Sequence, residues 1–558
     1  MIPAAWRPKS WECLRQYDRR TFARDLIAGV TVGLVALPLA MAFAISSGVP
    51  PQAGLYCAVI AGFLISALGG SRTQIGGPTG AFVVVVSGII AHHGLDGLLT
   101  CTIMAGVMLV VLGATGMGTA VDYIPRPVIV GFTNGIAVLI ASTQIRDLLG
   151  LTIAQPSGVF IPRLIQIAHA LPTVSPAAAI LAASSLVVIV VGNRLTRRVP
   201  GTILALLAGT VVALVLRLPV ETIGSRFGGL PAGLPPFSPP HVRLELLQPL
   251  LVPALTVAML GAIESLMSAV VADRMTGDRH NPNVELVAQG VANIVSPLFG
   301  GLPATGAIAR TATNIRSGAR TPVAGMIHAL TLLAILIFAA PYARFVPLPI
   351  LAAILLVVAY HMGDWEEIPE LLKLSRADIS VWLVTFALTV LADLTVAVEV
   401  GMILAALLFI RKVAATTTVS EVTEEDIEEG RVHVLQGKVI PDDVIVFRIH
   451  GPFLFGSADK LDAIVERISE LPRIVILRLR NMTAIDATGM RAIEDLADRL
   501  HGTDRTLILC GARRQPAQLM AQAEFDEHIG HGNICANVQE ALDRAQALRE
   551  AAPRSHGG

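Results

Sequence analysis

One acidic and one basic residue occupy stretches of the sequence that are otherwise almost wholly apolar: Glu264 and Arg310. A carboxylate inside a membrane segment costs several kcal/mol unless it is paired, so such a residue indicates a functional site. We expect Glu264 to bind a coupling ion, a proton or sodium. Ser268 lies four residues on, on the same helical face, and would add a hydroxyl. The alternative is that a protonated Glu264 only ties two helices together.

A glycine-proline break precedes Arg310 and has an echo earlier in the chain. Residues 300–307 read Gly-Gly-Leu-Pro-Ala-Thr-Gly-Ala, and residues 76–81 read Gly-Gly-Pro-Thr-Gly-Ala. Non-helical backbone at membrane depth persists only where it lines a protein cavity or water. We therefore expect a binding site at these breaks, with helices that begin near Pro78 and Pro303. Their free amides would favour an anion.

The candidate anion ligands follow these two breaks. Arg310, about two turns after Pro303, would either anchor the anion or neutralise Glu264, unless the short helix ends early and leaves it in a surface loop. The threonine hydroxyls would donate hydrogen bonds. The predicted substrate-binding residues are Thr79, Gly80, Ala81, Thr305, Gly306, Ala307 and Arg310.

The two breaks belong to an internal repeat. Thr305 lies 226 residues after Thr79, and a second echo places Pro347 222 residues after Pro125. Two echoes at nearly one offset indicate two related halves. Interrupted hydrophobic segments at corresponding positions of two halves are the best sequence pointer to the binding site of a secondary transporter.

Composition identifies a membrane protein. The chain has 558 residues, of which 53% are hydrophobic and 15% charged, whereas soluble proteins carry roughly 25% charged residues. The formal net charge is zero, so the composition gives no indication of a basic surface that would bind nucleic acid. Five cysteines without metal or redox spacing predict neither a metal site nor disulfides. No catalytic pattern appears, so we expect no enzyme activity and no cofactor.

Fourteen hydrophobic segments fit a span of roughly 20 residues, or a shorter one where a helix is broken. An odd number of seven per half makes the two repeats inverted. The expected segments are 25–47, 53–69, 79–92, 96–116, 124–142, 176–193 and 200–217, then 251–271, 284–299, 304–315, 322–341, 348–361, 378–393 and 395–411.

The bias of basic residues sets the expected orientation. Most basic loop residues, Arg197, Arg198 and Arg320 among them, fall on the same side as the N-terminus. By the positive-inside rule both termini are then cytoplasmic, which predicts a multi-pass protein of the inner membrane. Beyond the last segment, strand and helix patterns alternate, with a helix expected over 457–470, and predict a soluble α/β domain.

The chain resembles the SulP (sulfate permease) family of anion transporters with a cytoplasmic STAS domain. Nearly the whole chain takes part in this resemblance, and its 256–311 block looks particularly like the branch that includes an aerobic C4-dicarboxylate transporter. The stretches that carry it are 25–31, 76–81, 125–127, 261–266, 272–273, 283–290, 300–311 and, in the STAS part, 485–489.

This resemblance implies a fold and a mechanism. The fold is mostly α-helical, with fourteen transmembrane segments in two inverted seven-segment repeats (core and gate domains), plus a cytoplasmic α/β STAS domain. An elevator-like movement, a homodimer, contact with membrane lipid and a cytoplasmic partner of the STAS domain are also implied. The expected boundaries are an N-terminal segment 1–24, a transporter domain 25–412 (repeats about 25–217 and 251–411), a linker 413–431, the STAS domain 432–550 and a tail 551–558.

The resulting functional prediction is proton-coupled uptake of a C4-dicarboxylate such as succinate or fumarate. Sodium-coupled bicarbonate transport and sulfate transport remain open, as do an anion channel and a STAS-linked sensor. Thr488 lies where the related anti-sigma antagonists carry a phosphorylatable serine, so it is a candidate regulatory site. A simple helix start is the alternative for that turn.

Overall fold

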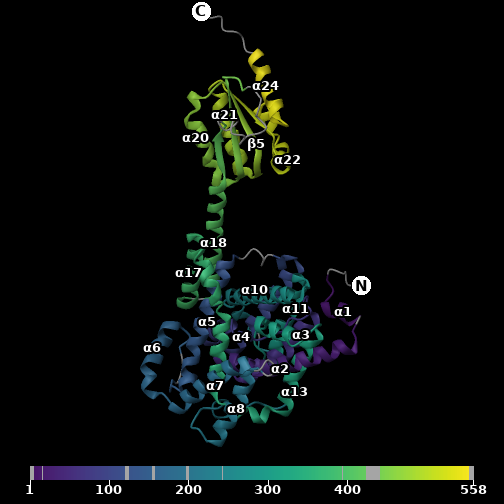
Figure 1. The fold of residues 1–558 in the computed structure, drawn as a ribbon, viewed down its shortest axis with the longest axis vertical. Coiled ribbons are helices and arrows are strands. Elements are labelled where there is room, and N and C mark those ends of the chain that lie inside the picture. Colours follow the sequence, from purple (N-terminus) through teal and green to yellow (C-terminus); the bar gives the residue numbers. More distant parts are fainter. Residues whose placement is uncertain are drawn as a thin grey trace, which may run out of the picture. The chain divides into compact units, whose positions relative to one another are not determined.

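A computed structural model of the chain describes residues 6–15, 17–119, 125–153, 157–195, 200–241, 243–392, 394–422 and 440–551. It divides into two compact units, Met1–Ile403 and Leu404–Gly558, with the strands and helices drawn in Figure 1. Residues outside the described part include Arg197 and Arg198, the second half of the expected linker (423–431), the first residues of the expected STAS domain (432–439) and 552–558.

The first unit is built almost wholly from helices. Seven of its described helices are long and apolar enough to cross a membrane, and Gly201–Val215 and Val323–Phe338 are shorter apolar helices. The main helices are α1 (Lys9–Leu14), α2 (Arg19–Ser46), α3 (Pro51–Leu68), α4 (Phe82–Ala114), α5 (Arg126–Leu149), α6 (Phe160–Ala170), α7 (Pro176–Leu195), α8 (Gly201–Val215), α9 (Ile223–Phe227), α10 (Leu251–Thr276), α11 (Pro282–Val295), α12 (Ile308–Arg316), α13 (Val323–Phe338), α14 (Ala340–Ala343), α15 (Leu348–Met362), α16 (Ile368–Leu371), α17 (Arg376–Leu391) and α18 (Leu394–Thr416).

Each of the fourteen expected segments overlaps one of these helices, although the number that cross a membrane remains a prediction. Two expected segments, 79–92 and 96–116, merge into α4. Gly94 kinks that helix with a φ of 68°, a left-handed conformation that glycine adopts without steric cost. His92 and His93, at the junction of the two expected segments, therefore lie within α4.

The two glycine-proline breaks meet in the centre of the first unit. They form a short antiparallel pair, β1 (Gly76–Gly77) with β2 (Thr305–Gly306), in which Gly76 faces Gly306 and Gly77 faces Thr305. The following helices begin only at Phe82 and Ile308. The prediction that helices start near Pro78 and Pro303 is therefore wrong, because the intervening residues are extended or turn-forming.

The second unit contains a five-stranded sheet in the order β3-β4-β5-β6-β7. The first pair is antiparallel and the rest are parallel. Strands and helices are β3 (Thr418–Glu421), β4 (Val444–Phe453), α20 (Asp462–Glu466), β5 (Ile474–Ile485), α21 (Ala487–His501), β6 (Thr506–Cys510), α22 (Arg514–Gln522), α23 (Phe525–Ile529), β7 (Ile534–Cys535) and α24 (Val538–Ala551).

Both faces of this sheet are buried, as parallel sheets require. Alternate strand residues such as Val475 and Leu477 pack with α21 and α22, whereas Ile474 and Ile476 pack with α24. The single helix expected over 457–470 is wrong. That stretch is a 3₁₀ turn, the short α20 and a second 3₁₀ turn, and Ser457 bonds Thr417 and Pro452 rather than capping a helix.

The 485–489 stretch has a clear structural role. Asp486 is the N-cap of α21 and accepts hydrogen bonds from the amides of Gly489, at 2.8 Å, and Phe455, at 3.0 Å. A Cβ on Gly489 would collide with the carbonyl of Phe453, so only glycine fits there. Thr488 lies exposed in the same first turn.

Asp486→Ala should destabilise the second unit by about 1 kcal/mol, the usual cost of losing a helix cap, and lower its melting temperature by roughly 4–8 °C. Burial raises the pKa of the Cys510 thiol to about 12, so alkylation of Cys510 on heating reports unfolding. Thr488→Ala, in the same turn without a capping role, is the control. Equal melting curves for the two variants would contradict the capping role.

Candidate functional site

Glu264 lies in the middle of α10 and has one direct partner. The hydroxyl of Thr79 donates to its Oε2 at 2.8 Å. Thr79 is itself buried just after β1. The predicted acid and one predicted ligand threonine, 185 residues apart in sequence, therefore meet in the fold.

The second threonine of the repeat also bonds α10. Thr305 in β2 is fully buried and donates to the carbonyl oxygen of Gly261 at 2.9 Å. A hydroxyl has only one proton to donate. In this conformation neither Thr79 nor Thr305 can donate to an anion as well, so the expected hydroxyl donors instead fix the two breaks to α10.

Arg310 is the third residue of α12 and is only 3% exposed. Its Nη2 donates to the carbonyl oxygen of Pro78, whereas Nη1 has no hydrogen-bond partner. Both residues are described, yet Arg310 and Glu264 form no ion pair with each other. Of the alternatives, the surface loop is wrong. In this conformation Arg310 does not neutralise Glu264 directly. Arg310 is therefore a buried cation with one nitrogen free to donate a hydrogen bond.

A glycine makes room for this guanidinium. A Cβ built on Gly77 would lie 2.8 Å from Nη1 of Arg310, and Gly77 has a φ of 145°, where side chains are rarely tolerated. Gly77 therefore allows the arginine to approach the β1–β2 pair. Arg310 belongs to the first turn of α12, whose first amides have no partner within the helix.

The other predicted ligand positions serve packing or capping. Gly306 has no room for a side chain, since a Cβ there would collide with the Gln74 amide. A Cβ on Gly80 would press on Ile140, at 2.9 Å. Ala81 and Ala307 are the buried N-cap residues of α4 and α12. These positions shape the site, where Nη1 of Arg310 is a donor without a partner.

Ser268 is fully buried but does not reach Glu264. Its hydroxyl shares a hydrogen bond of 3.0 Å with Thr311 Oγ1, which also accepts the amide of Ile75 at 3.0 Å. Ser268 does lie on α10, as the sequence predicted, but its hydrogen-bond partner Thr311 comes from α12. Ser268 therefore supports the β1–β2 pair.

Family models match almost the whole chain. The model described as the sulfate permease family matches residues 22–385, and the STAS domain model matches residues 438–541. The chain belongs to the sulfate permease family. It is an anion transporter of that family and not an enzyme, as the sequence predicted.

Two relatives each align with more than nine-tenths of the chain. A putative sulfate transporter, YvdB, from Bacillus subtilis is 43% identical over 92% of this chain and 96% of its own length. The bicarbonate transporter BicA from Picosynechococcus is 30% identical over 94% and 95%. No dicarboxylate transporter is among these sulfate permease relatives, so that branch assignment stays a prediction.

Solved structures agree on the fold. The transmembrane domain of a cyanobacterial BicA is 34% identical and covers 70% of this chain and 98% of its own, with a TM-score of 0.61. SLC26A9 is 17% identical and covers 98% of this chain and 93% of its own, with a TM-score of 0.85. These likenesses confirm a mostly helical membrane domain followed by an α/β STAS domain.

Sequence reasoning missed a second buried carboxylate of this sulfate permease chain. Glu285 on α11 is 1% exposed. Its Oε2 accepts the amides of Gly70 at 2.9 Å and Ser71 at 3.2 Å, and its Oε1 accepts the Gln289 side chain at 2.9 Å. The signal was available, because an acid and an amide four residues apart share one face of an apolar helix.

Glu285→Gln should destabilise the sulfate permease fold by about 1–3 kcal/mol, because an amide cannot accept from all of these buried donors. Substrate selectivity in the folded fraction should not change. Thermal unfolding of the purified protein measures the loss, with the exposed Glu366→Gln as control. A change of substrate selectivity without loss of stability would contradict this structural role and indicate that Glu285 takes part in transport.

Proposed function

We propose that this protein is a secondary active transporter that carries a small inorganic oxyanion, bicarbonate or sulfate, across the inner membrane. An elevator-like movement of the core domain against the gate domain, fourteen membrane segments, cytoplasmic termini and a homodimer belong to the same proposal. Family membership supports the transport of anions. The choice of anion rests on the site and on the relatives.

The observation that carries the proposal is the free Nη1 of Arg310 inside the protein. A buried donor without a partner costs about 1–3 kcal/mol, and more when it is charged. An oxyanion bound beside the β1–β2 pair would accept from this nitrogen and from the first amides of α12. A helix N-terminus adds a partial positive charge that favours an anion.

The number of free cations favours a small oxyanion. A C4-dicarboxylate carries two separated carboxylates, whereas the proposed site offers one guanidinium with one free nitrogen. Arg163, the other buried arginine among the described residues, has bonds to Ser157, Gly158 and Ser142. The names of the YvdB and BicA relatives point the same way. The uptake assay described below includes succinate to test the dicarboxylate prediction.

Glu264 is the proposed coupling group, with Thr79 as its partner. The hydroxyl of Thr79 can donate to a charged carboxylate, or rotate and accept from a protonated one. The pair can therefore hold either charge state of Glu264 without losing its hydrogen bond. Since Thr79 is the second residue after β1, a change at Glu264 is passed through Pro78 to the β1–β2 pair.

Uptake into proteoliposomes tests the function. Labelled bicarbonate, sulfate and succinate are offered under an imposed pH gradient, an imposed sodium gradient or neither. Concentrative uptake of bicarbonate or sulfate under one gradient is expected. Uptake of succinate alone would replace the proposed substrate, and transport that never exceeds electrochemical equilibrium would indicate a channel.

Arg310→Gln should weaken binding of the transported anion by about tenfold or more, because a charge-assisted hydrogen bond contributes roughly 1.5–3 kcal/mol. Calorimetry on the purified protein measures the affinity. Arg163→Gln removes another buried arginine, one whose bonds are internal, and is expected to lower stability without weakening binding in the folded fraction. Unchanged affinity in Arg310→Gln would remove Arg310 from the site.

Glu264→Gln should still bind the anion but lose accumulation driven by the coupling gradient, while exchange of anions across the membrane continues. The amide keeps the size of the side chain and cannot take up a proton. Gradient-driven and exchange uptake are measured side by side, with Glu366→Gln as control. Accumulation that depends on the gradient as in the parent would show that the coupling ion binds elsewhere.

A further inference from the structure

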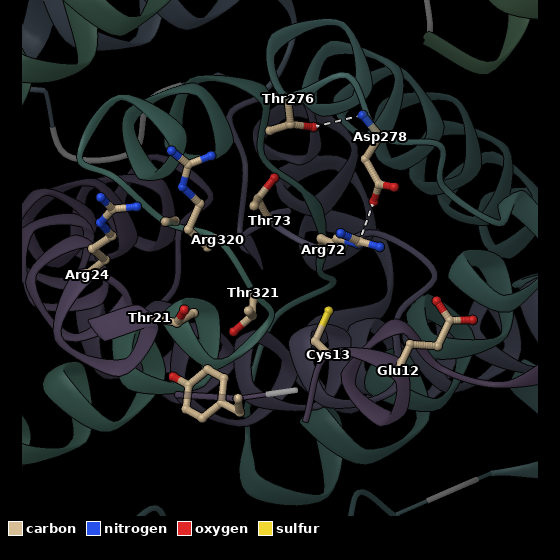
Figure 2. Close-up of a pocket in the computed structure, with 12 residues that line it drawn as sticks. Glu12, Cys13, Thr21, Arg24, Arg72, Thr73, Thr276, Asp278, Arg320 and Thr321 are labelled. Carbon is tan, nitrogen blue, oxygen red and sulfur yellow. Dashed lines mark hydrogen bonds and ion pairs between the residues drawn. The ribbon is translucent and has the colours of Figure 1, made fainter. Parts of the chain in front are cut away.

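A second polar site lies outside the region assigned to transport. It is a pocket of about 410 Å³ lined by Glu12, Cys13, Tyr17, Thr21, Arg24, Arg72, Thr73, Thr276, Asp278, Ala319, Arg320 and Thr321, shown in Figure 2. None of these residues belongs to the proposed transport site. The volume is within the range of roughly 300–1,000 Å³ that is usual for small-molecule sites.

Four separate segments wall the pocket and are fixed to one another. The helix α1 packs on the end of α3, where Lys9 N donates to Gly69 O at 3.0 Å. Asp25 of α2 is fully buried and accepts the amides of Arg320, at 2.7 Å, and Thr321, at 3.2 Å. These bonds tie the start of α2 to the turn between α12 and α13. The pocket is thus built into the fold.

The two carboxylates that line the pocket are paired with cations, whereas the buried Asp25 accepts hydrogen bonds from Tyr17, Arg320 and Thr321 and has no cationic partner among the described residues. Glu12 pairs with Lys9 at 3.5 Å, and Asp278 pairs with Arg72 at 2.9 Å and with Lys9 at 3.9 Å. Burial and the nearby Asp25 carboxylate raise the pKa of Tyr17 to about 12, so this phenol stays neutral.

Two guanidinium groups remain unpaired. Within the described part of the chain, the side chains of Arg24 and Arg320 make neither an ion pair nor a hydrogen bond. Figure 2 draws both on one side of the pocket, with Thr21 on that side, and Arg72 with Asp278 on the other, with Thr73 and Thr321 between them. Two free guanidiniums beside several hydroxyls are the groups that recognise phosphate oxygens.

We propose that this pocket binds a phosphate group through Arg24 and Arg320. The phosphate can belong to a soluble phosphate monoester or to the headgroup of an anionic lipid, because exposed apolar residues of α2, including Phe22 and Ile27, follow at the same end of the helix. A ligand here would touch Thr73, whose carbonyl accepts from Asn314 of α12 at 2.8 Å. Thr73 precedes β1 by three residues, so occupancy also bears on the transport site.

Cys13 gives a local readout, because Figure 2 shows its sulfur pointing into the pocket. It is the one described cysteine that is not buried. Burial of part of the side chain raises the pKa of its thiol, so labelling by a maleimide is slow enough to follow. Cys13→Ser supplies the background rate. Protection at Cys13 reports this pocket and not the Arg310 site.

The experiment uses the full-length protein in two arms at constant ionic strength. In detergent the probes are inorganic phosphate and glycerol 3-phosphate. In nanodiscs the comparison is phosphatidylcholine with and without phosphatidic acid. We expect phosphate to slow labelling of Cys13 in at least one arm. The soluble arm alone would identify a free phosphate ester, and the nanodisc arm alone a lipid headgroup.

The variants separate this site from transport. The double variant Arg24→Gln with Arg320→Gln should weaken protection by about tenfold or more, whereas Arg316→Gln, an exposed arginine outside the pocket, should leave it unchanged. Arg310→Gln should also retain protection, so failure of the transport proposal does not affect this one. No protection in either arm, or protection that survives the double variant, would overturn the proposal.

Discussion

Backbone that leaves a helix inside a membrane protein must find partners within the protein, and the structure depends on how two such breaks satisfy each other. The β1–β2 pair uses one break as the partner of the other. Around it, Asn293 brackets Ala304 with two hydrogen bonds of 2.8 Å, and Ile75 accepts the amide of Ala307 at 2.8 Å. The two breaks therefore form one junction held by hydrogen bonds from both sides, and α4 and α12 begin just after it.

The polar side chains around this junction are of two kinds, those whose hydrogen bonds hold the fold and those with few partners. Thr305, Ser268 and Thr311 use their hydroxyls to hold strands and helices in place. The buried Glu285 is enclosed by donors from the 70–71 loop and by Gln289. The two charged groups at the junction have few partners: Glu264 has a single hydroxyl partner, and one nitrogen of Arg310 has none.

The sequence predicted which residues and helices make up this junction better than it predicted their long-range pairing and hydrogen-bond partners. Composition, repeat offset and glycine-proline breaks located the membrane helices, Glu264, Arg310 and both threonines. The helix starts at Pro78 and Pro303 were wrong because proline is compatible with a first helical turn, whereas pairing with a strand 229 residues away is not a local property. Ser268 was placed on α10 correctly, yet its partner Thr311 comes from another helix. The division of 457–470 into short turns likewise follows from the long-range contact of Ser457 with Thr417.

The two repeats contribute unequally to the site, and this bears on how the site can move. Glu264 and Arg310, the two charges, both come from the second repeat, on α10 and α12. Their direct partners, the Thr79 hydroxyl and the Pro78 carbonyl, both come from the first. Each charge is thus held by a bond that crosses between the repeats, and both bonds end on adjacent residues. A motion that separated the breaks would release both charges into an apolar interior at a cost of several kcal/mol each. The junction should therefore move as one body, carrying a bound anion with it.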